Sequence, residues 1–283
     1  MARPQRLEFP GAIYHVTSRG NEQQSIFADG EDRAFFLDTL GRVAARFRWL
    51  VHAYCLMDNH YHLVIETLEG KLSIGMRQLN GIYTQHFNLR HGLDGPVMHG
   101  RFKAILLERD TFLLDMCRYV VLNPLRTRTV KAPEKYPWSS YRATAGLIDT
   151  PAFLDTEWVL RQFGKQKKTA ERHYQEFVTD GMDGGNPWEH LRKQILLGSE
   201  EFVAAMAPLL GDAGRIREHQ LRERRSKRPT LTQLFAKARD KVQRNDAIRL
   251  AHLKHLYSLN EIGQFVGLHF ATVSKIANTV VEE

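Results

Sequence analysis

Two histidines one residue apart are the first candidates for chemistry in this chain. They are His60 and His62, in the stretch MDNHYHLVIE at residues 57–66. The stretch has the composition of a strand, and side chains alternate across a strand, so both imidazoles would share one face. Such a pair can be a metal site, a proton-handling pair or two ordinary surface residues, and histidine alone does not decide among them. Glu66 would share that face, but it lies two strand steps from His62, and we leave it out of a metal shell.

A tyrosine and an asparagine four residues apart are the second candidates. They are Tyr119 and Asn123, in FLLDMCRYVVLNPLR at residues 112–126. We predict a helix here, so the two side chains would share one of its sides. Pro124 is expected to end the helix, because the residue before a proline disfavours helical geometry, and Asn123 would then lie in the last turn. Taken alone, the pair would be a core tyrosine and an asparagine cap.

The elements that must position these residues follow from the periodicity of the chain before about residue 145. Strands and amphipathic helices alternate there in the order β-α-β-β-α-β. The predicted elements are a strand at 12–20, a helix at 31–47, two strands within 49–66, a helix at 72–92 and a strand at 101–110. This α+β order is that of the ferredoxin-like fold, a four-stranded antiparallel sheet with helices on one face and the other face open. The open face could hold a site, beside the added helix at 112–126.

Composition excludes several classes of protein. The chain is 43% hydrophobic and 25% charged, typical of a soluble protein, and no apolar run is long enough to span a bilayer. The N-terminal stretch lacks the apolar core of a secretion signal, so we expect a cytoplasmic protein. Cys55 and Cys117 are the only cysteines, which argues against a disulfide framework or a cysteine metal site. A formal net charge of +8 suggests a polyanionic partner, with nucleic acid as the leading candidate.

The end of the chain predicts a helix-turn-helix. Ser258 and Glu261 have the spacing of a capping box, Gly267 supplies a turn, and HFATVSKIAN at 269–278 supplies a second short helix. The residues then exposed to a DNA groove would be Ala271, Thr272, Ser274 and Lys275. Many small helical pairs show this pattern without touching DNA. A glycine-rich hinge at 180–187 and a basic segment at 215–229, either a DNA-tracking arm or a solvated linker, precede this region.

Five stretches together resemble the HUH single-tyrosine (IS200-like) transposases, and most closely their REP-associated branch. They are YHVTSRGN at 14–21, MDNHYHLVIE at 57–66, HGRFKA at 99–104, RYVVLNPLR at 118–126 and YPWSSYRA at 136–143. The resemblance covers about the first half of the chain. Each motif alone is weak, but five in the family's order and spacing make a specific match.

This resemblance implies a role for each candidate residue. His60 and His62 would be the metal-binding histidines of the HUH motif, with Tyr61 between them in place of an aliphatic residue. Tyr119 would be the nucleophile, and Asn123 would be a metal ligand one helical turn further on. Two imidazoles and a carboxamide are too few ligands to saturate a divalent ion, which favours Mg²⁺ or Mn²⁺ with positions left for phosphate oxygens and water.

Neighbouring residues each have two interpretations. Arg101 and Lys103 would alternate on a predicted strand and either bind DNA phosphates or form a solvated basic face. The resemblance suggests that Arg19 and Asn21 contact DNA bases, and a plain surface turn is the alternative. Tyr83 is the rival nucleophile, but its helical spacing favours packing in the core.

We therefore expect a metal-dependent single-stranded DNA endonuclease and strand transferase that forms a 5′-phosphotyrosine at repeat hairpin DNA. The expected parts are an HUH catalytic domain at 1–146, a helical extension with a basic linker at 147–240, and a helix-turn-helix domain at 241–283. Its partner would be single-stranded or hairpin DNA with REP-like repeats, bound by a monomer or homodimer away from any membrane. The alternatives are a DNA-binding regulator that does not cut, and an RNA-binding module, whose aromatic stacking motif is not apparent in the sequence.

Overall fold

Two compact units make up the chain, residues 1–211 and residues 212–283. The computed structural model describes residues 6–21, 24–182, 191–192, 195–206, 208–209, 229–236, 238–255, 257, 259–269, 272–273 and 276–277. The predicted boundary after residue 146 does not separate compact units. Leu160 and Tyr174, which follow it, are buried in the same core as Met116 and Val120.

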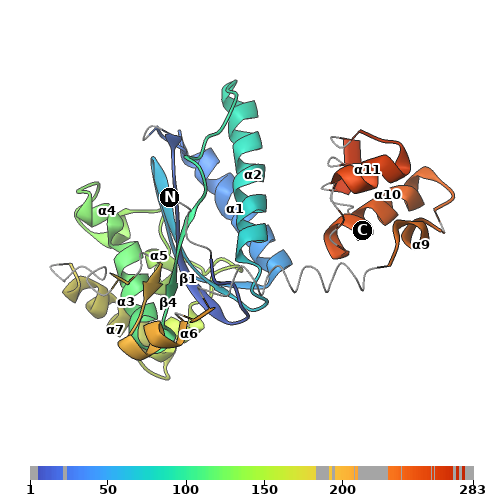
Figure 1. Cartoon of the computed structure of the whole chain (residues 1–283). Coiled ribbons are helices and arrows are strands. Elements are labelled where there is room, and N and C mark those ends of the chain that lie inside the picture. The colour runs from blue at the N-terminus through green and yellow to red at the C-terminus, as the bar shows by residue number, and fades with distance from the viewer. Residues whose placement is uncertain are drawn as a thin grey trace. The chain divides into compact units, whose positions relative to one another are not determined.

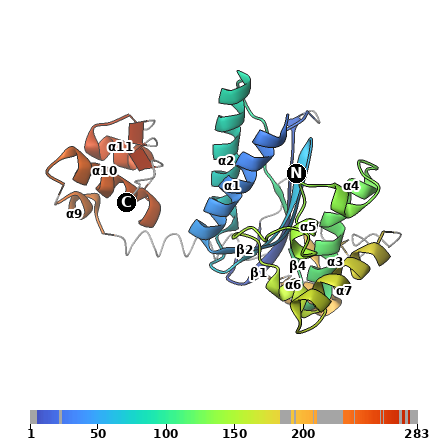
Figure 2. The same cartoon turned by 180° about the vertical axis from the view of Figure 1, so that it is seen from behind.

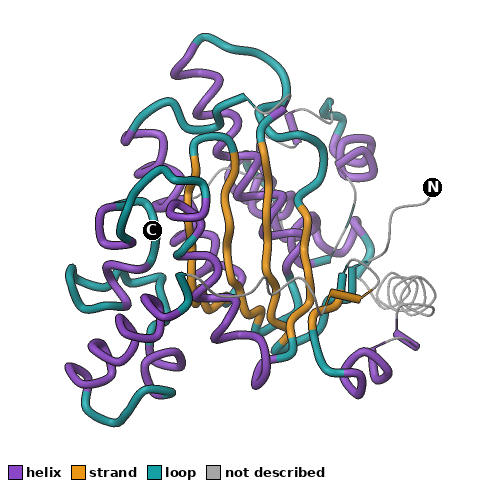
Figure 3. Tube along the Cα trace, turned by 90° about the vertical axis from the view of Figure 1, so that its left-hand side faces the viewer, coloured by secondary structure: helices purple, strands orange, loops and turns teal. Residues whose placement is uncertain are grey.

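A six-stranded sheet organises the first unit, in the strand order β2-β3-β1-β4-β6-β5. The strands are β1 (Ala12–Arg19), β2 (Trp49–Met57), β3 (His60–Thr67), β4 (Lys103–Leu107), β5 (Leu191–Arg192) and β6 (Leu196–Leu197), with the long strands side by side in Figure 3. The α+β class is confirmed. The prediction of four strands, all antiparallel, is wrong, because β6 pairs parallel with β4 and β5 pairs with β6. Strands of two residues leave no periodic signal in a sequence.

Helices cover both faces of this sheet (Figures 1 and 2). Helices α1 (Gly30–Phe47) and α2 (Leu72–His91) pack on each other over the face of Tyr61, whose hydroxyl donates to Asn80 Oδ1 at 2.6 Å. Helix α3 (Arg109–Val121) packs on the opposite face, against β1, β2 and β3. The expected open face is therefore covered where α3 lies, because the apolar side of α3 is buried against residues such as Val64.

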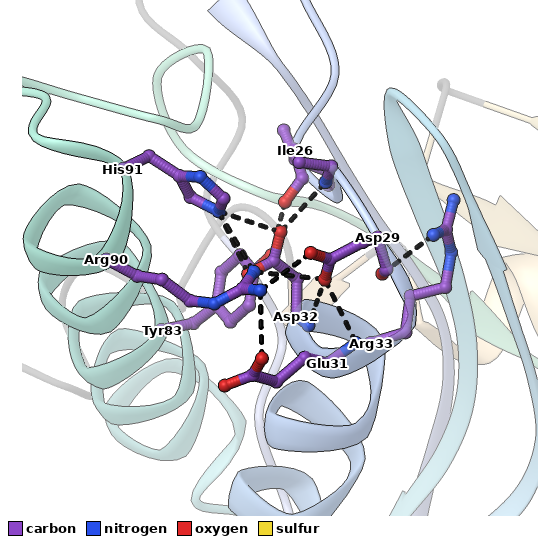
Figure 4. Close-up of polar contacts among 9 residues, drawn as sticks. Ile26, Asp29, Glu31, Asp32, Arg33, Tyr83, Arg90 and His91 are labelled. Atoms are coloured by element: carbon purple, nitrogen blue, oxygen red, sulfur yellow. Dashed lines mark hydrogen bonds and ion pairs between the residues drawn. The ribbon is translucent and has the colours of Figure 1, made fainter.

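The start of α1 is tied to the end of α2 by an ion-pair network (Figure 4). Asp29 caps α1 by accepting from the backbone N–H groups of Glu31 and Asp32. Arg90, in the last turn of α2, reaches Asp29 at 2.6 Å and Asp32 at 2.7 Å, and His91 lies 3.0 Å from Asp32. The Asp32 side chain is fully buried, so these partners replace the water that it loses on folding.

The predicted helix at 112–126 is interrupted after Val121. Leu122 caps α3, and a short helix α4 (Asn123–Arg126) begins at the next residue. The prediction that Pro124 ends a helix is wrong, because Pro124 lies in the first turn of α4, where a backbone N–H needs no helical partner. Asn123 therefore begins α4 instead of lying in the last turn of a longer helix.

The segment between α4 and β5 adds one 3₁₀ turn and three helices to the first unit. Its elements are the 3₁₀ turn η2 (Pro133–Lys135) and the helices α5 (Tyr141–Thr144), α6 (Glu157–Arg161) and α7 (Lys167–Asp180). Single backbone bridges join Ser139 to Cys55 and Leu154 to Val51, so this segment runs along the outer edge of β2.

The second unit is helical in its described residues. Its elements are α9 (Leu231–Phe235), α10 (Lys241–Arg249), the π-helical turn η4 (Leu250–Lys254) and α11 (Leu259–Val266). Gly267 follows α11 with a φ of 68°, a left-handed conformation that favours glycine, and residues 272–273 and 276–277 are again helical. Val273 and Ala277 are buried with Ile248 and Ile262 in a separate core.

Several predicted features lie outside the described residues. They are Ser258, Ala271, Ser274, Lys275, most of the proposed hinge at 180–187 and all of the basic segment at 215–229 except Pro229. In the part of the chain that is described, no helix combines the length and apolar character needed to cross a membrane.

Candidate active site

Strand register places a row of polar side chains on the α3 face of the sheet. His62 pairs with Thr17 of β1, and His60 pairs with Arg19 at the end of the same strand. Lys103 of β4 pairs with Thr17 from the other side. Because directly paired residues point to the same face, the predicted contacts Arg19 and Lys103 share the face of the histidines, and both are exposed.

Asn21 and Arg101 are not among the paired strand residues of this row. Asn21 follows β1, and its side-chain oxygen lies 3.1 Å from His99 Nδ1. Arg101 is exposed but precedes β4, so the prediction that Arg101 and Lys103 alternate within one strand is wrong. Thr272 is exposed in the second unit.

Tyr119 of α3 lies against the histidines of the sheet. The centroid of its ring is 6.2 Å from that of His62, and the two ring planes are nearly perpendicular. The rings of His60 and His62 are themselves 4.9 Å apart. Tyr119 is half-buried, and His62 is buried at 8% exposure. The structure thus brings three of the predicted site residues together within one chain.

His15 is a residue of this site that our sequence analysis missed. It is 3% exposed on β1, its Nε2 lies 2.9 Å from His62 Nδ1, and its ring is stacked on that of His62. Its ring centroid is also 6.3 Å from that of Tyr119. Alternation along YHVTSRGN places His15 on the face of Thr17 and Arg19, but only the pairing of β1 with β3 brings it beside His62.

Asn123 and Arg126 both contact Tyr119. Asn123 is buried, and its Nδ2 donates to the Tyr119 carbonyl at 3.2 Å, which leaves the carboxamide oxygen as an acceptor. The guanidinium carbon of Arg126 lies 5.2 Å from the centroid of the Tyr119 ring, within the range of a cation–π interaction. We did not single out Arg126 from the sequence, although its spacing of seven from Tyr119 amounts to about two helical turns.

Burial keeps the histidines of the site neutral. It lowers the pKa of His15 to about 3. Burial also lowers the pKa of His62 well below the usual value, and His15 and His60 add to this effect. The pKa of His60 is lowered by burial as well, which Asp58 partly opposes. A neutral imidazole is the form that binds a metal ion.

The donor atoms of the site fit a divalent cation that keeps open positions. His62 Nε2 is buried and has no hydrogen-bond partner among the described residues. His60 Nδ1 lies 2.7 Å from Asn59 Oδ1, so its Nε2 is the nitrogen left for a ligand. Within the described ranges, no group of three or more His, Cys, Asp or Glu side chains could hold a metal ion. A cation held by His60 and His62 would therefore depend on an oxygen such as that of Asn123 and on oxygens of a substrate.

Two other residues weighed in the sequence have structural partners. Glu66 is buried and bonds both His52 Nε2, at 3.2 Å, and the guanidinium of Arg109. Tyr83 is fully buried between α1 and α2, where its hydroxyl donates to the Ile26 carbonyl and burial raises its pKa (Figure 4).

Comparison with known proteins finds a family model that is similar to the first part of the chain. Residues 9–95 match the family model described as Transposase IS200 like. The matched range holds His15, His60 and His62 and ends before Tyr119.

One solved structure is similar to part of this chain. It shows a REP-associated tyrosine transposase bound to a REP hairpin. The two chains are 16% identical with a TM-score of 0.45, and the similarity covers 56% of this chain and 91% of that one. No curated protein matches the sequence.

Proposed function

We propose that this protein is a REP-associated tyrosine transposase, a metal-dependent endonuclease and strand transferase for single-stranded or hairpin DNA. The observation that carries the proposal is the contact of the Tyr119 ring with the ring of His62, in a chain whose residues 9–95 match the IS200-like transposase model. The proposal takes residues 12–107 as a ferredoxin-like core, supported by the antiparallel strand order β2-β3-β1-β4. The second unit would be a helix-turn-helix that binds DNA through residues such as Thr272.

Tyr119 would cut the DNA by transesterification. Its phenol oxygen bonds to the scissile phosphorus, the bond from phosphorus to the 3′ oxygen breaks, and the leaving oxygen takes up a proton as a free 3′-OH. The phenol gives its own proton to solvent or to a base. The product is a 5′-phosphotyrosine, and attack of a 3′-OH on it rejoins a strand without any nucleotide cofactor. A covalent intermediate of this kind replaces one difficult step by two easier ones.

The side chains around Tyr119 would hold the phosphate in line. His60 and His62, through Nε2, and Asn123, through its carboxamide oxygen, would hold Mg²⁺ or Mn²⁺. That ion would polarise the phosphoryl oxygens and stabilise the negative charge that develops on them. Arg19, Lys103 and Arg126 are exposed cations near this row, suited to the neighbouring phosphates of the strand.

A covalent-adduct assay tests this function. The protein is incubated with labelled single-stranded DNA carrying a repeat hairpin from its own genome, with Mg²⁺ or Mn²⁺, and then denatured. We expect a denaturation-resistant protein–DNA adduct with the wild type and none with Tyr119→Phe. Tight binding without adduct, across several repeat substrates and both metals, would instead support a regulator that does not cut.

Mixing two impaired variants tests whether one chain holds the whole site. Because the rings of Tyr119 and His62 meet within one chain, Tyr119→Phe mixed with His62→Ala should form adduct no faster than His62→Ala alone. A rate of adduct formation in the mixture well above that of His62→Ala alone would show that the tyrosine works on a partner's histidines.

A further inference from the structure

We infer that Glu66 is a positioning residue for the proposed cleavage, because its bond to Arg109 fixes where α3 lies along β3. The position of α3 in turn decides where Tyr119 meets His62. The inference rests on the proposed function, since it gives Glu66 a task in the same reaction. Its starting point is that Glu66, near one end of β3, bonds the first residue of α3, while the histidines lie at the other end of that strand.

The spacings along the helix and the strand match. Tyr119 lies ten residues beyond Arg109 in α3, which spans about 15 Å at the rise of an α-helix. Glu66 lies four residues beyond His62 in β3, which spans about 13 Å at the rise of a strand. The helix therefore runs in the opposite direction to β3, with a side-chain contact at each end of the matched spans.

The packing between these two contacts is apolar. Leu113, Met116 and Val120 of α3 are fully buried in one core with residues of the sheet such as Val64. Burial of apolar surface is favourable but non-directional, so it favours contact with the sheet more than any one position along it. A hydrogen bond between two charged side chains is short and directional, and it can select one position.

Glu66 is itself held in place by His52 of β2. Glu66 is 5% exposed, and His52 Nε2 lies 3.2 Å from its carboxylate. Strand alternation would send His52 to the other face, but the register of β2 and β3 shifts between Val51 and Ala53. Such a bulge re-aims a side chain, here toward Glu66. Burial opposes ionisation of Glu66, but the bonds from His52 and Arg109 outweigh it and hold the pKa of Glu66 below its usual value.

Arg109 occupies a position that a helix by itself disfavours for a cation. It is the first residue of α3, and the N-terminal end of a helix carries a partial positive charge. The bond to Glu66 offsets this cost. The Arg109 side chain is 35% exposed, so its replacement should leave the helix intact and change only what the helix is tied to.

Single-turnover cleavage of a hairpin substrate tests the inference, with the Kd for DNA measured without divalent ions. Arg109→Met removes the charge and should slow cleavage by about 10- to 100-fold at an unchanged Kd, because a displacement of about 1 Å can cost about 100-fold in rate. Glu66→Leu should repeat this loss. Arg109→Lys keeps a cation that can reach Glu66 and should stay within a few-fold of the wild type.

Tyr14→Phe is the matched control. It removes a buried hydrogen bond to the Leu7 carbonyl from the same sheet, at a residue paired with Ile65 on the opposite face. The rate per folded molecule should equal that of the wild type. Urea unfolding gives the folded fraction of each variant, and Arg109→Met alone decides the outcome if Glu66→Leu does not fold.

Proton NMR on the DNA-free protein measures the geometry without cleavage. The wild type should show nuclear Overhauser contacts between the ring protons of Tyr119 and His62, and these contacts should weaken in Arg109→Met but not in Arg109→Lys or Tyr14→Phe. Ring contacts or cleavage rates unchanged in Arg109→Met would overturn the inference, and so would a loss confined to DNA affinity. Ring contacts that depend on Arg109, in a protein that forms no adduct, would overturn the cleavage function and leave the role of Glu66 in placing α3 standing.

Discussion

The tyrosines and histidines on the two faces of the sheet differ in their burial and in their hydrogen bonds. On the face covered by α1 and α2, the hydroxyls of Tyr61 and Tyr83 are buried, and each has a hydrogen-bond partner. On the face covered by α3, His62 Nε2 is buried without one among the described residues, and the half-buried Tyr119 lies against the His62 ring. The residue type alone therefore does not show whether a tyrosine or histidine in a strand or helix is structural or reactive. What distinguishes Tyr119 from Tyr61 and Tyr83 is that it is half-buried and lies beside a buried histidine nitrogen that has no partner among the described residues.

Substitution of Tyr119 and of Tyr83 should give the largest difference in adduct formation between the two faces. Tyr119→Phe should lower adduct formation by about 10³-fold or more, because it removes the attacking oxygen. Tyr83→Phe should keep adduct formation and lower the free energy of unfolding by about 1 kcal/mol, because it removes a buried hydrogen bond. Adduct yield and urea unfolding measure the two effects. An adduct that persists in Tyr119→Phe and disappears in Tyr83→Phe would reverse our assignment of the faces.

Neighbouring residues of β3 provide the next comparison. His62→Ala should lower the cleavage rate by about 10- to 100-fold and weaken Mn²⁺ binding, because it removes a proposed ligand. Ile65→Val, on the opposite face of the same strand, should cost about 0.5–1.5 kcal/mol of stability and leave the rate per folded molecule unchanged. Single-turnover cleavage on a hairpin substrate measures the rates. Equal losses of rate in both variants would mean that His62 acts only through the stability of the sheet.

Two arginines near aromatic rings test a smaller effect. Arg126 lies over the Tyr119 ring, and Arg42 of α1 lies 5.9 Å from the centroid of the Phe35 ring. Arg126→Gln should slow cleavage by about 2- to 30-fold, the equivalent of about 0.5–2 kcal/mol for a lost cation–π contact. Arg42→Gln should have no effect on cleavage. A rate for Arg126→Gln equal to that of the wild type would remove Arg126 from the site.

A substitution in the ion-pair network at the start of α1 should have the smallest effect on the cleavage rate and a clear effect on stability. Burial opposes ionisation of Asp32, but bonds from Ala28 N–H, His91 and Arg90 outweigh it and hold the pKa of Asp32 below its usual value. A lowered folded pKa stabilises the protein above the unfolded pKa of about 4, and this stability is lost as the pH falls below it.

Asp32→Asn should therefore destabilise the protein at pH 7 by about 1–3 kcal/mol and lose less stability than the wild type as the pH falls below about 4. Urea unfolding at pH 7 and at acid pH measures both effects. An unchanged dependence on pH would show that Asp32 does not contribute its charge to stability. Cleavage per folded molecule should be that of the wild type.

Local periodicity was enough to predict the elements with a strong pattern. The helix expected at 72–92 is α2 (Leu72–His91), and Gly92 follows it in the left-handed conformation with a φ of 64°. Alternation also placed Tyr61 on the face opposite His60 and His62, which its bond to Asn80 confirms. These features depend on residues a few positions apart, and the sequence displays them directly.

Features that depend on distant partners could not be predicted in this way. His15 joins the site only through the register of β1 with β3, strands that lie far apart along the chain. The break between α3 and α4 also escaped prediction. The preference of residues before proline for extended geometry is local, and here a new helix that accepts Pro124 in its first turn overrides it.

The short strands β5 and β6 affect how much of the chain is needed to keep the protein soluble. An uncovered strand edge presents free backbone groups to other molecules, and in this protein both flanks of the four long strands are shielded. The segment with Ser139 and Leu154 covers β2, and β6 covers β4. A fragment that stops at residue 182 would keep the proposed residues around Tyr119 yet leave the edge of β4 bare. We expect such a fragment to aggregate, so the chain required for solubility is longer than the chain required for chemistry.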